Sequence, residues 1–204
     1  MRKKIIVGVL TVMIIAIFFL LHLISKDPDL ASYEFLKEPR ITTLANQNVV
    51  VVEAQGDPNA VGGKAFGLLF KTYYKIEGII RGPIQPAPRA RWTGDMKVKS
   101  SWTGYYALPV PNTVVSLPAT EKDPGYKVEL TKWEYGDVAE ILHVGPYAAE
   151  TPTIEKLHAF IKQKGYEIAG YHEEEYLKGP GMFFKGDPAG YYTIIRYQVK
   201  HKTE

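Results

Sequence analysis

The sequence repeats one pattern of elements, and this internal repeat limits the folds that the chain can adopt. In the first half, the β-branched run at residues 49–52 predicts a strand, and apolar side chains at helical spacing predict a helix around residues 66–73. In the second half, residues 138–144 predict a strand and residues 154–161 predict a helix. Both halves therefore read as a strand followed by an amphipathic helix.

The closing strands of the two halves are also alike, because Gly-Tyr-Tyr occurs at residues 104–106 and again at 190–192. A short sheet of one half cannot bury both of its faces, so the two halves are expected to join. The predicted fold class is α+β, with duplicated β-α-β-β modules forming a curved antiparallel sheet with helices on one side. The halves span about residues 41–115 and 126–200, and a ligand cleft is expected at their junction.

Other local signals fill in this outline. Glycine and proline interrupt residues 77–100, which predicts a loop, whereas residues 101–110 and 126–133 predict strands. Thr153 is the expected N-cap of the second helix, and Gly165 is its expected end.

The N-terminal residues 5–24 form an uncharged apolar run of 20 residues. As a helix this run is roughly 30 Å long, enough to cross the hydrocarbon core of a bilayer. A cleaved signal peptide is the alternative, but it needs an apolar region of only ~7–15 residues followed by small residues at a cleavage site. The sequence therefore predicts one uncleaved transmembrane helix that anchors the chain.

The charges around this run predict its orientation. Arg2, Lys3 and Lys4 precede it, and only Lys26 follows it closely, which favours a cytoplasmic N-terminus. We therefore expect a cytoplasmic stub at residues 1–4, the anchor at 5–24, a juxtamembrane spacer at 25–40 and an extracytoplasmic domain at 41–200. The predicted localisation is the inner membrane of a bacterium, as a single-pass protein with an unidentified membrane partner.

Composition excludes several classes of function. The net charge of +3 comes from the three N-terminal cations, so residues 26–204 are electrically balanced and nucleic acid is not an expected partner. The chain has no cysteine, which excludes disulfides, cysteine nucleophiles and thiolate metal sites. The apolar share of 46% allows a sizeable core.

The second half carries the sequence YGDVAEILHVGPY at residues 135–147, then Gly-Tyr at 165–166, Glu-Tyr-Leu at 175–177 and Pro180. In these residues the chain resembles the GyrI-like small-molecule-binding domain. That domain also serves as the effector-binding module of BmrR-like and AraC-type transcription regulators. The resemblance covers roughly residues 41–200 and is stronger in the second half.

This resemblance implies an aromatic pocket between the two halves, often with an acidic residue, for lipophilic or cationic ligands. The last strand of the family commonly begins Thr-Glu, whereas this chain has Thr193 and Ile194, and Tyr105 stands at the equivalent place of the first half. The difference weakens the expectation of cation binding and of the hydrolysis of strained-ring compounds found in some members. Glu140 or Glu175 could replace the missing carboxylate only if its side chain points inward.

The expected ligand site combines aromatic residues of both half-motifs with these glutamates. Aromatic faces attract cations by ~0.5–2 kcal/mol each, although aromatic residues also pack in cores without any ligand. The neighbouring glutamates at residues 173–175 equally suit a solvated run. The candidate ligand-binding residues are Trp102, Tyr105, Tyr106, Glu140, Tyr147, Glu175, Tyr176, Tyr192 and Ile194.

No motif predicts a catalytic residue, a metal site or a cofactor. His143, His158 and His172 lack the spacing of zinc ligands, and neither a phosphate-binding loop nor a Gly-x-Ser-x-Gly elbow occurs. The leading hypothesis is a membrane-anchored protein that binds a small apolar or amphipathic molecule. The alternatives are a small-molecule hydrolase with Glu140 or Glu175 as base, and an adaptor whose groove binds a protein partner.

Overall fold

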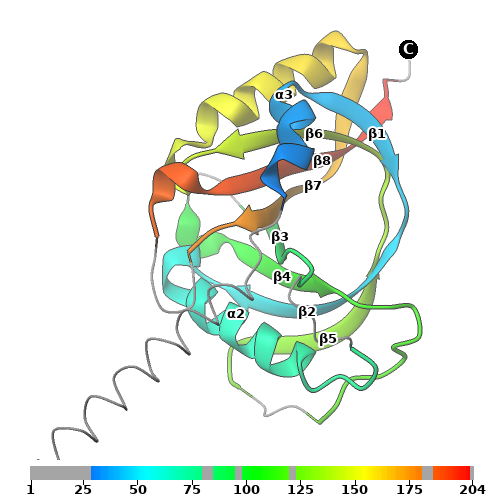
Figure 1. Cartoon of the computed structure of the whole chain (residues 1–204), viewed down its shortest axis with the longest axis vertical. Helices are drawn as coiled ribbons and strands as arrows, with labels where there is room; N and C mark the ends of the chain where they lie inside the picture. Colours follow the sequence, from blue (N-terminus) through cyan, green and yellow to red (C-terminus); the bar gives the residue numbers. More distant parts are fainter. Residues whose placement is uncertain (1–28, 80–84, 95–97, 120–122, 181–185, 203–204) are drawn as a thin grey trace, which may run out of the picture.

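One antiparallel sheet of eight strands organises the chain, and its fold class is α+β as predicted. The computed structural model describes residues 29–79, 85–94, 98–119, 123–180 and 186–202. Within these ranges the sheet curves strongly, and helices pack against it (Figure 1).

The same succession of elements occurs twice, which confirms the duplicated β-α-β-β pattern. The first unit consists of β2 (Gln47–Gln55), α2 (Pro58–Tyr73), β3 (Arg89–Thr93) and β4 (Thr103–Pro109). The second unit consists of β6 (Gly136–Val144), α3 (Thr151–Gln163), β7 (Tyr166–Lys178) and β8 (Tyr192–His201).

The strand order is β1-β6-β8-β7-β3-β4-β2-β5, so the two units meet where β3 pairs with β7. We call this junction the seam. The two edge strands tie the units together, because each pairs with the unit that does not follow it in the chain. β1 (Arg40–Leu44) precedes β2 but pairs with β6, and β5 (Tyr126–Trp133) precedes β6 but pairs with β2.

Helices α2 and α3 cover the same face of the sheet, which we call the helix face, and the opposite face is the inner face. Val50 and Val52 of β2 pack with residues of α2, and Ile141 of β6 packs with Leu157 of α3. The 3-10 helix η1 (Leu30–Lys37) lies on the inner face instead, where Leu36 contacts Leu142 and Ile194. The prediction of helices on one side is therefore right for α2 and α3 and wrong for η1. The remaining 3-10 helices are η2 (Lys99–Ser101), η3 (Tyr147–Ala149) and η4 (Pro188–Gly190).

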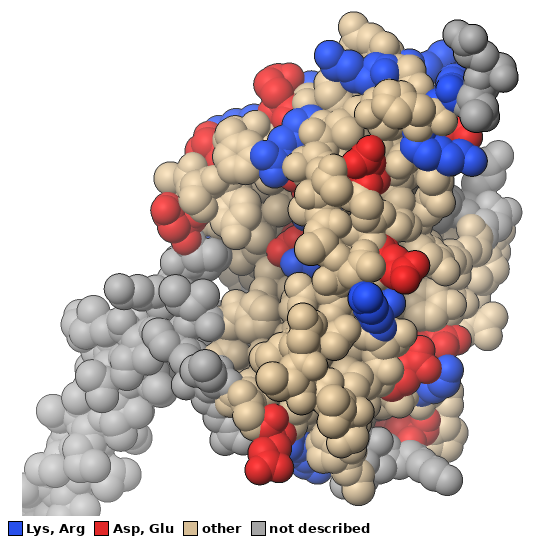
Figure 2. Space-filling view, turned by 90° about the vertical axis from the view of Figure 1, so that its right-hand side faces the viewer, with Lys and Arg blue, Asp and Glu red and all other residues tan. Residues whose placement is uncertain are grey.

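The surface formed by the connections from β1 to β2 and from β5 to β6 carries acidic and basic side chains intermixed (Figure 2). Beneath this surface Trp133 and Tyr135 are buried, and the side-chain Oδ1 of Asn46 accepts a hydrogen bond from the backbone N–H of Tyr135 at 3.0 Å. This contact joins the two connections where they pass each other.

Two local predictions are wrong. Residues 89–93 form the strand β3 inside the predicted loop, because Ala90 and Trp92 face α2 while Arg89 and Arg91 find acidic partners on the inner face. Thr153 is not the N-cap, since α3 begins at Thr151 after Glu150, and the Thr153 hydroxyl lies 3.0 Å from Nδ1 of His143. Gly165 follows the helix with a positive φ of 77°, as expected for a helix end.

The predicted localisation as a single-pass inner-membrane protein is contradicted. None of the helices in the ranges described above has the length and apolar character needed to cross a membrane. The predicted span at residues 5–24 and the stub at 1–4 lie outside the described residues.

Candidate functional site

Strand β7 crosses the middle of the sheet beside the seam, and its side chains alternate between the two faces. Glu173 and Glu175 point to the inner face, whereas His172, Glu174 and Tyr176 point to the helix face. Three consecutive glutamates therefore belong to two different environments.

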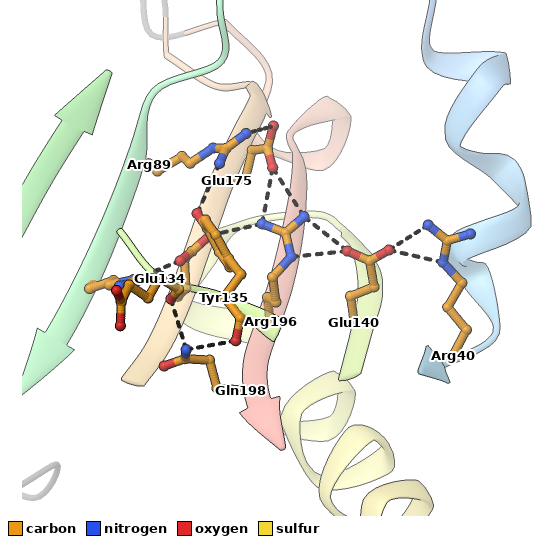
Figure 3. A network of polar contacts seen from close by, with 10 residues as sticks. Arg40, Arg89, Glu134, Tyr135, Glu140, Glu175, Arg196 and Gln198 are labelled. Atoms are coloured by element: carbon orange, nitrogen blue, oxygen red, sulfur yellow. Dashed lines mark hydrogen bonds and ion pairs between the residues drawn. The ribbon is translucent and has the colours of Figure 1, made fainter. Parts of the chain in front are cut away.

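On the inner face, Arg196 of β8 lies at the centre of a buried network of charges (Figure 3). Its Nε donates to Oε2 of Glu140 at 3.0 Å, and its Nη1 donates to Oε1 of Glu173 at 2.8 Å. Its Nη2 donates to Oε2 of Glu175 at 3.1 Å. Burial by itself would lower the pKa of Arg196, but the three carboxylates raise it, so this guanidinium stays charged.

Further arginines complete the network from both edges. Arg40 of β1 binds Glu140 at 2.6 Å, and Arg89 and Arg91 of β3 bind Glu175 and Glu173 at 3.2 and 2.7 Å. Arg89 and Arg91 stand directly opposite these glutamates in the register between β3 and β7. Each carboxylate thus has at least one arginine beside it, which is what allows charge to be buried here.

Aromatic side chains close the network. The Tyr135 hydroxyl donates to Glu173 at 2.9 Å and accepts from Nη1 of Arg89 at 2.9 Å. Burial raises the pKa of Tyr135 to about 12, so it acts as a neutral donor. The Arg91 guanidinium lies 4.0 Å from the centre of the Trp133 ring, a cation–π distance.

On the helix face, aromatic rings form a continuous row across the seam. Neighbouring ring centres in this row lie between 4.9 and 5.8 Å apart, mostly in edge-to-face or tilted arrangements. The row runs through Trp102, Trp92, Tyr106, Phe66, Tyr176, Tyr147 and Tyr191.

Glu174 lies against this row and accepts two hydrogen bonds. The Tyr176 hydroxyl donates to its Oε2 at 2.5 Å, and His172 Nε2 lies 2.8 Å from its Oε1. Because a carboxylate only accepts, Nε2 of His172 carries the proton, which leaves Nδ1 to accept from the Tyr197 hydroxyl at 2.6 Å. Tyr197, His172 and Glu174 therefore form a connected chain of hydrogen bonds.

Glu150, just before α3, is the second acidic residue on this face. It is 6% exposed, and its Oε1 has no hydrogen-bond partner among the described residues. Burial, reinforced by the nearby charge of Glu174, raises the pKa of Glu150 from its ordinary 4.5 to about 9. In the described part of the chain, neither Glu150 nor Glu174 forms an ion pair with lysine or arginine. We call Glu150 and Glu174 the acidic pair.

An open groove of about 600 Å³ lies at one end of the seam. It follows an irregularity of β7, where the pairing with β8 shifts register between Ile168 and His172. His172 lines the groove and also contacts Glu174, whereas neither glutamate of the acidic pair lines the groove itself. The groove is lined by Trp92, Thr93, Gly94, His158, Ile168, Ala169, Gly170, Tyr171, His172, Tyr197 and Gln198.

The candidate residues from the sequence fall on both faces. Trp102, Tyr106, Tyr147 and Tyr176 belong to the row of rings on the helix face. Glu140, Glu175 and Ile194 lie on the inner face, where Ile194 stands opposite Glu175 in the register of β7 and β8. Tyr105 contacts Tyr171, and Tyr192 packs against the cluster around Leu36. The two glutamates do point inward, but their carboxylates are bound by arginines.

Sequence reasoning missed Glu150, Glu174, His172, Tyr197 and Trp92. Alternation along β7 was the available signal, because in a strand the middle glutamate of three faces away from the other two. No comparable pattern marks Glu150. Within the described ranges, no three acidic or histidine side chains are arranged to hold a metal ion.

Comparisons with known proteins support the fold. No protein-family model and no curated protein matches this chain. Among solved structures, an uncharacterised conserved protein from Listeria innocua is 23% identical to this chain, with a TM-score of 0.69. The match covers 84% of this chain and 97% of the Listeria protein. A hydrolase from Listeria innocua is 21% identical with a TM-score of 0.64, covering 80% and 92%.

The C-terminal domain of EcmrR is 13% identical with a TM-score of 0.58, covering 81% of this chain and 98% of that domain. At identities this low, the likeness shows a shared fold and nothing about activity. It agrees with the expected GyrI-like architecture.

Proposed function

We propose that this chain binds a small amphipathic molecule that carries a positive charge, in the seam between its two halves. The observation that carries the proposal is the acidic pair beside the aromatic rings: Glu150 is buried, the Glu174 side chain is 13% exposed, and neither has a lysine or arginine partner among the described residues. A ligand cation would supply the missing positive charge.

The surrounding rings suit such a ligand. Tyr176 hydrogen-bonds Glu174, and its ring lies 5.6 Å from that of Tyr147. Aromatic faces next to a carboxylate attract the charge of a cation and also bury its apolar parts. Apolar or aromatic groups of the ligand would extend from the acidic pair toward the open groove.

The inner face is a weaker candidate for the same role. Its carboxylates already have guanidinium partners, and a second cation near Arg40, Arg89, Arg91 and Arg196 would be repelled. We therefore assign Glu140 and Glu175 a structural part in the proposed function, and we assign ligand charge recognition to Glu174.

Two dyes of similar size test the proposal with the full chain. Crystal violet is a lipophilic cation, and its leuco form is uncharged at neutral pH. We expect crystal violet to bind at least about tenfold more tightly than the leuco form, as measured by calorimetry. Glu174→Gln should weaken crystal violet binding by about tenfold or more, because it removes a desolvated charge.

Glu155→Gln is the matched control, since Glu155 is an exposed glutamate on α3 and the same atoms change. This control should bind both dyes as the parent chain does. Equal affinity for the two dyes, or full affinity in Glu174→Gln, would contradict the proposal.

The hydrogen-bonded chain of Tyr197, His172 and Glu174 favours a second candidate function, hydrolysis of a small molecule in the groove. In this candidate, Nδ1 of His172 takes the proton of the Tyr197 hydroxyl while the Tyr197 oxygen takes a proton from water, so His172 acts as general base through that tyrosine and Glu174 positions it. Release of p-nitrophenol from p-nitrophenyl acetate, lost in His172→Gln, would support this candidate. A rate equal to that without protein would rule it out for esters.

A further inference from the structure

We infer that Glu150 makes ligand binding in the seam an exchange of a proton for a cation. The inference rests on the proposed function and adds a regulation to it. When a cation binds beside Glu174, Glu150 releases its proton to solvent, and when the cation leaves, Glu150 takes a proton up again. The charge of the site is the same before and after binding, because one positive charge replaces another.

The position of Glu150 supports this exchange. Its residue is 6% exposed, and Oε1 lacks a hydrogen-bond partner among the described residues. A buried carboxylate without donors is costly, so the empty site favours the protonated acid. Burial and the charge of Glu174 raise the pKa of Glu150 to about 9, which also favours the protonated acid.

Besides burial, the charge of Glu174 is what raises the pKa of Glu150. On the elements packed around the site, Lys156 of α3 pairs with Glu38, and Lys178 of β7 is partly exposed. Burial lowers the pKa of His158, which keeps that imidazole neutral near pH 7. The titratable groups on the elements packed around the site are His143 on β6, Tyr147 on η3, Glu155 and His158 on α3, His172, Glu174 and Tyr176 on β7, and Tyr197 on β8.

Glu150 and Glu174 are not equivalent, and this explains which of them holds the proton. Glu174 accepts hydrogen bonds from His172 and Tyr176, both of which stabilise its charged form. Glu150 has no such donor on Oε1. The charge of Glu174 acts on Glu150, and the carboxyl that is more buried and has fewer donors carries the proton.

The exchange makes Glu150 a determinant of ligand charge. A cation pairs with both carboxylates after the proton leaves, whereas an uncharged ligand leaves the proton in place and gains no ion pair. Affinity for a cation should therefore rise with pH up to about 9, and affinity for an uncharged ligand should stay constant.

Calorimetry with crystal violet in two buffers of different ionisation enthalpy measures the released proton. At about pH 7.5 we expect the full chain to release about one proton per bound dye, and its affinity to rise by up to about tenfold per pH unit between about pH 6 and 8. The leuco dye should release none.

Glu150→Gln should abolish both the proton release and the pH dependence of crystal violet binding. Glu155→Gln, the matched control, should keep both. Glu150→Asp offers a second test, because it retains an ionisable acid and should still release a proton.

The outcomes separate the inference from the proposed function. Tight binding of crystal violet with no proton release would overturn the exchange and leave the binding function intact. Proton release that persists in Glu150→Gln would place the titrating group elsewhere and overturn the role of Glu150. If neither dye binds, the proposed function fails, and the exchange fails with it.

Discussion

Strand β7 presents neighbouring glutamates to two contrasting surroundings. On the inner face, Glu173 and Glu175 meet arginines from β3 and β8, and Tyr135 adds a further hydrogen bond to Glu173. On the helix face, Glu174 has His172 and Tyr176 as donors and no lysine or arginine among the described residues, and its charge acts on a second acid, Glu150.

The contrast shows what each face contributes. Carboxylates that pair with arginines of the same chain help to specify the fold, and they bind an additional ion only weakly. A carboxylate that the chain leaves without a cation is costly to bury in its charged form. Such a group is neutralised by a proton until a cationic ligand binds beside it.

Arg196→Met should cause the largest loss of stability. It leaves Glu140, Glu173 and Glu175 buried without their shared guanidinium, and breaking a buried ion pair costs about 3–5 kcal/mol. Urea unfolding of the full chain measures this loss. Lys200→Met removes an exposed pair with Glu167 on the same two strands and should change the free energy of unfolding by less than about 1 kcal/mol. Similar losses in both variants would mean that the inner network adds little.

Glu150→Gln should have the opposite sign and should depend on pH. The folded chain keeps a proton on Glu150 that the unfolded chain releases above its ordinary pKa of 4.5, so the free energy of unfolding falls as pH rises toward about 9. Glutamine abolishes this loss, which amounts to at most about 1.4 kcal/mol per pH unit. Unfolding at several pH values should therefore show Glu150→Gln gaining on the parent chain as pH rises. A constant difference would contradict a protonated Glu150.

These two environments could be predicted from the sequence only in part. The repeat, the run at residues 49–52 and the apolar periodicity of α3 depend on neighbours in sequence, and they correctly predicted β2, α3 and the two-fold repetition of the pattern. Strand β3 was missed because glycine and proline interrupt residues 77–100, whereas the strand is held by Arg89 and Arg91 pairing with Glu175 and Glu173 opposite them. That pairing joins residues more than 80 positions apart.

The prediction of the site was also incomplete because it depends on residues that are far apart in sequence. Tyr147 and Tyr176 could be selected from the half-motifs, because both follow local sequence signals. The burial of Glu150 depends on how the start of α3 packs beside β7, and no local pattern encodes it. The division of residues 173–175 between two faces follows from the alternation of side chains along a strand. It was not predicted, because three consecutive glutamates equally suit a solvent-exposed segment.

Gly104→Ala should test how tightly the row of rings is packed. A Cβ at Gly104 would lie 2.7 Å from Cζ3 of Trp92 and 2.8 Å from Cε2 of Tyr106. Overpacking of this kind costs about 1–3 kcal/mol and should also weaken crystal violet binding if the rings line the site. Gly67→Ala on α2 is the control, since no atom lies within 4 Å of its added Cβ, and it should stabilise the chain by about 0.5–1 kcal/mol.

A matched pair of tyrosine variants gives the smallest and most direct comparison of the two faces. Tyr135→Phe and Tyr176→Phe each remove one hydroxyl that donates to a glutamate, to Glu173 on the inner face and to Glu174 on the helix face. Glu173 keeps Arg91 and Arg196, whereas Glu174 keeps only His172.

Tyr176→Phe should therefore cost more, about 1–2 kcal/mol against about 1 kcal/mol or less for Tyr135→Phe, when both are measured by urea unfolding near pH 7. Equal losses would mean that the helix face compensates its carboxylates as fully as the inner face does, and that no charge is left there for a ligand to supply.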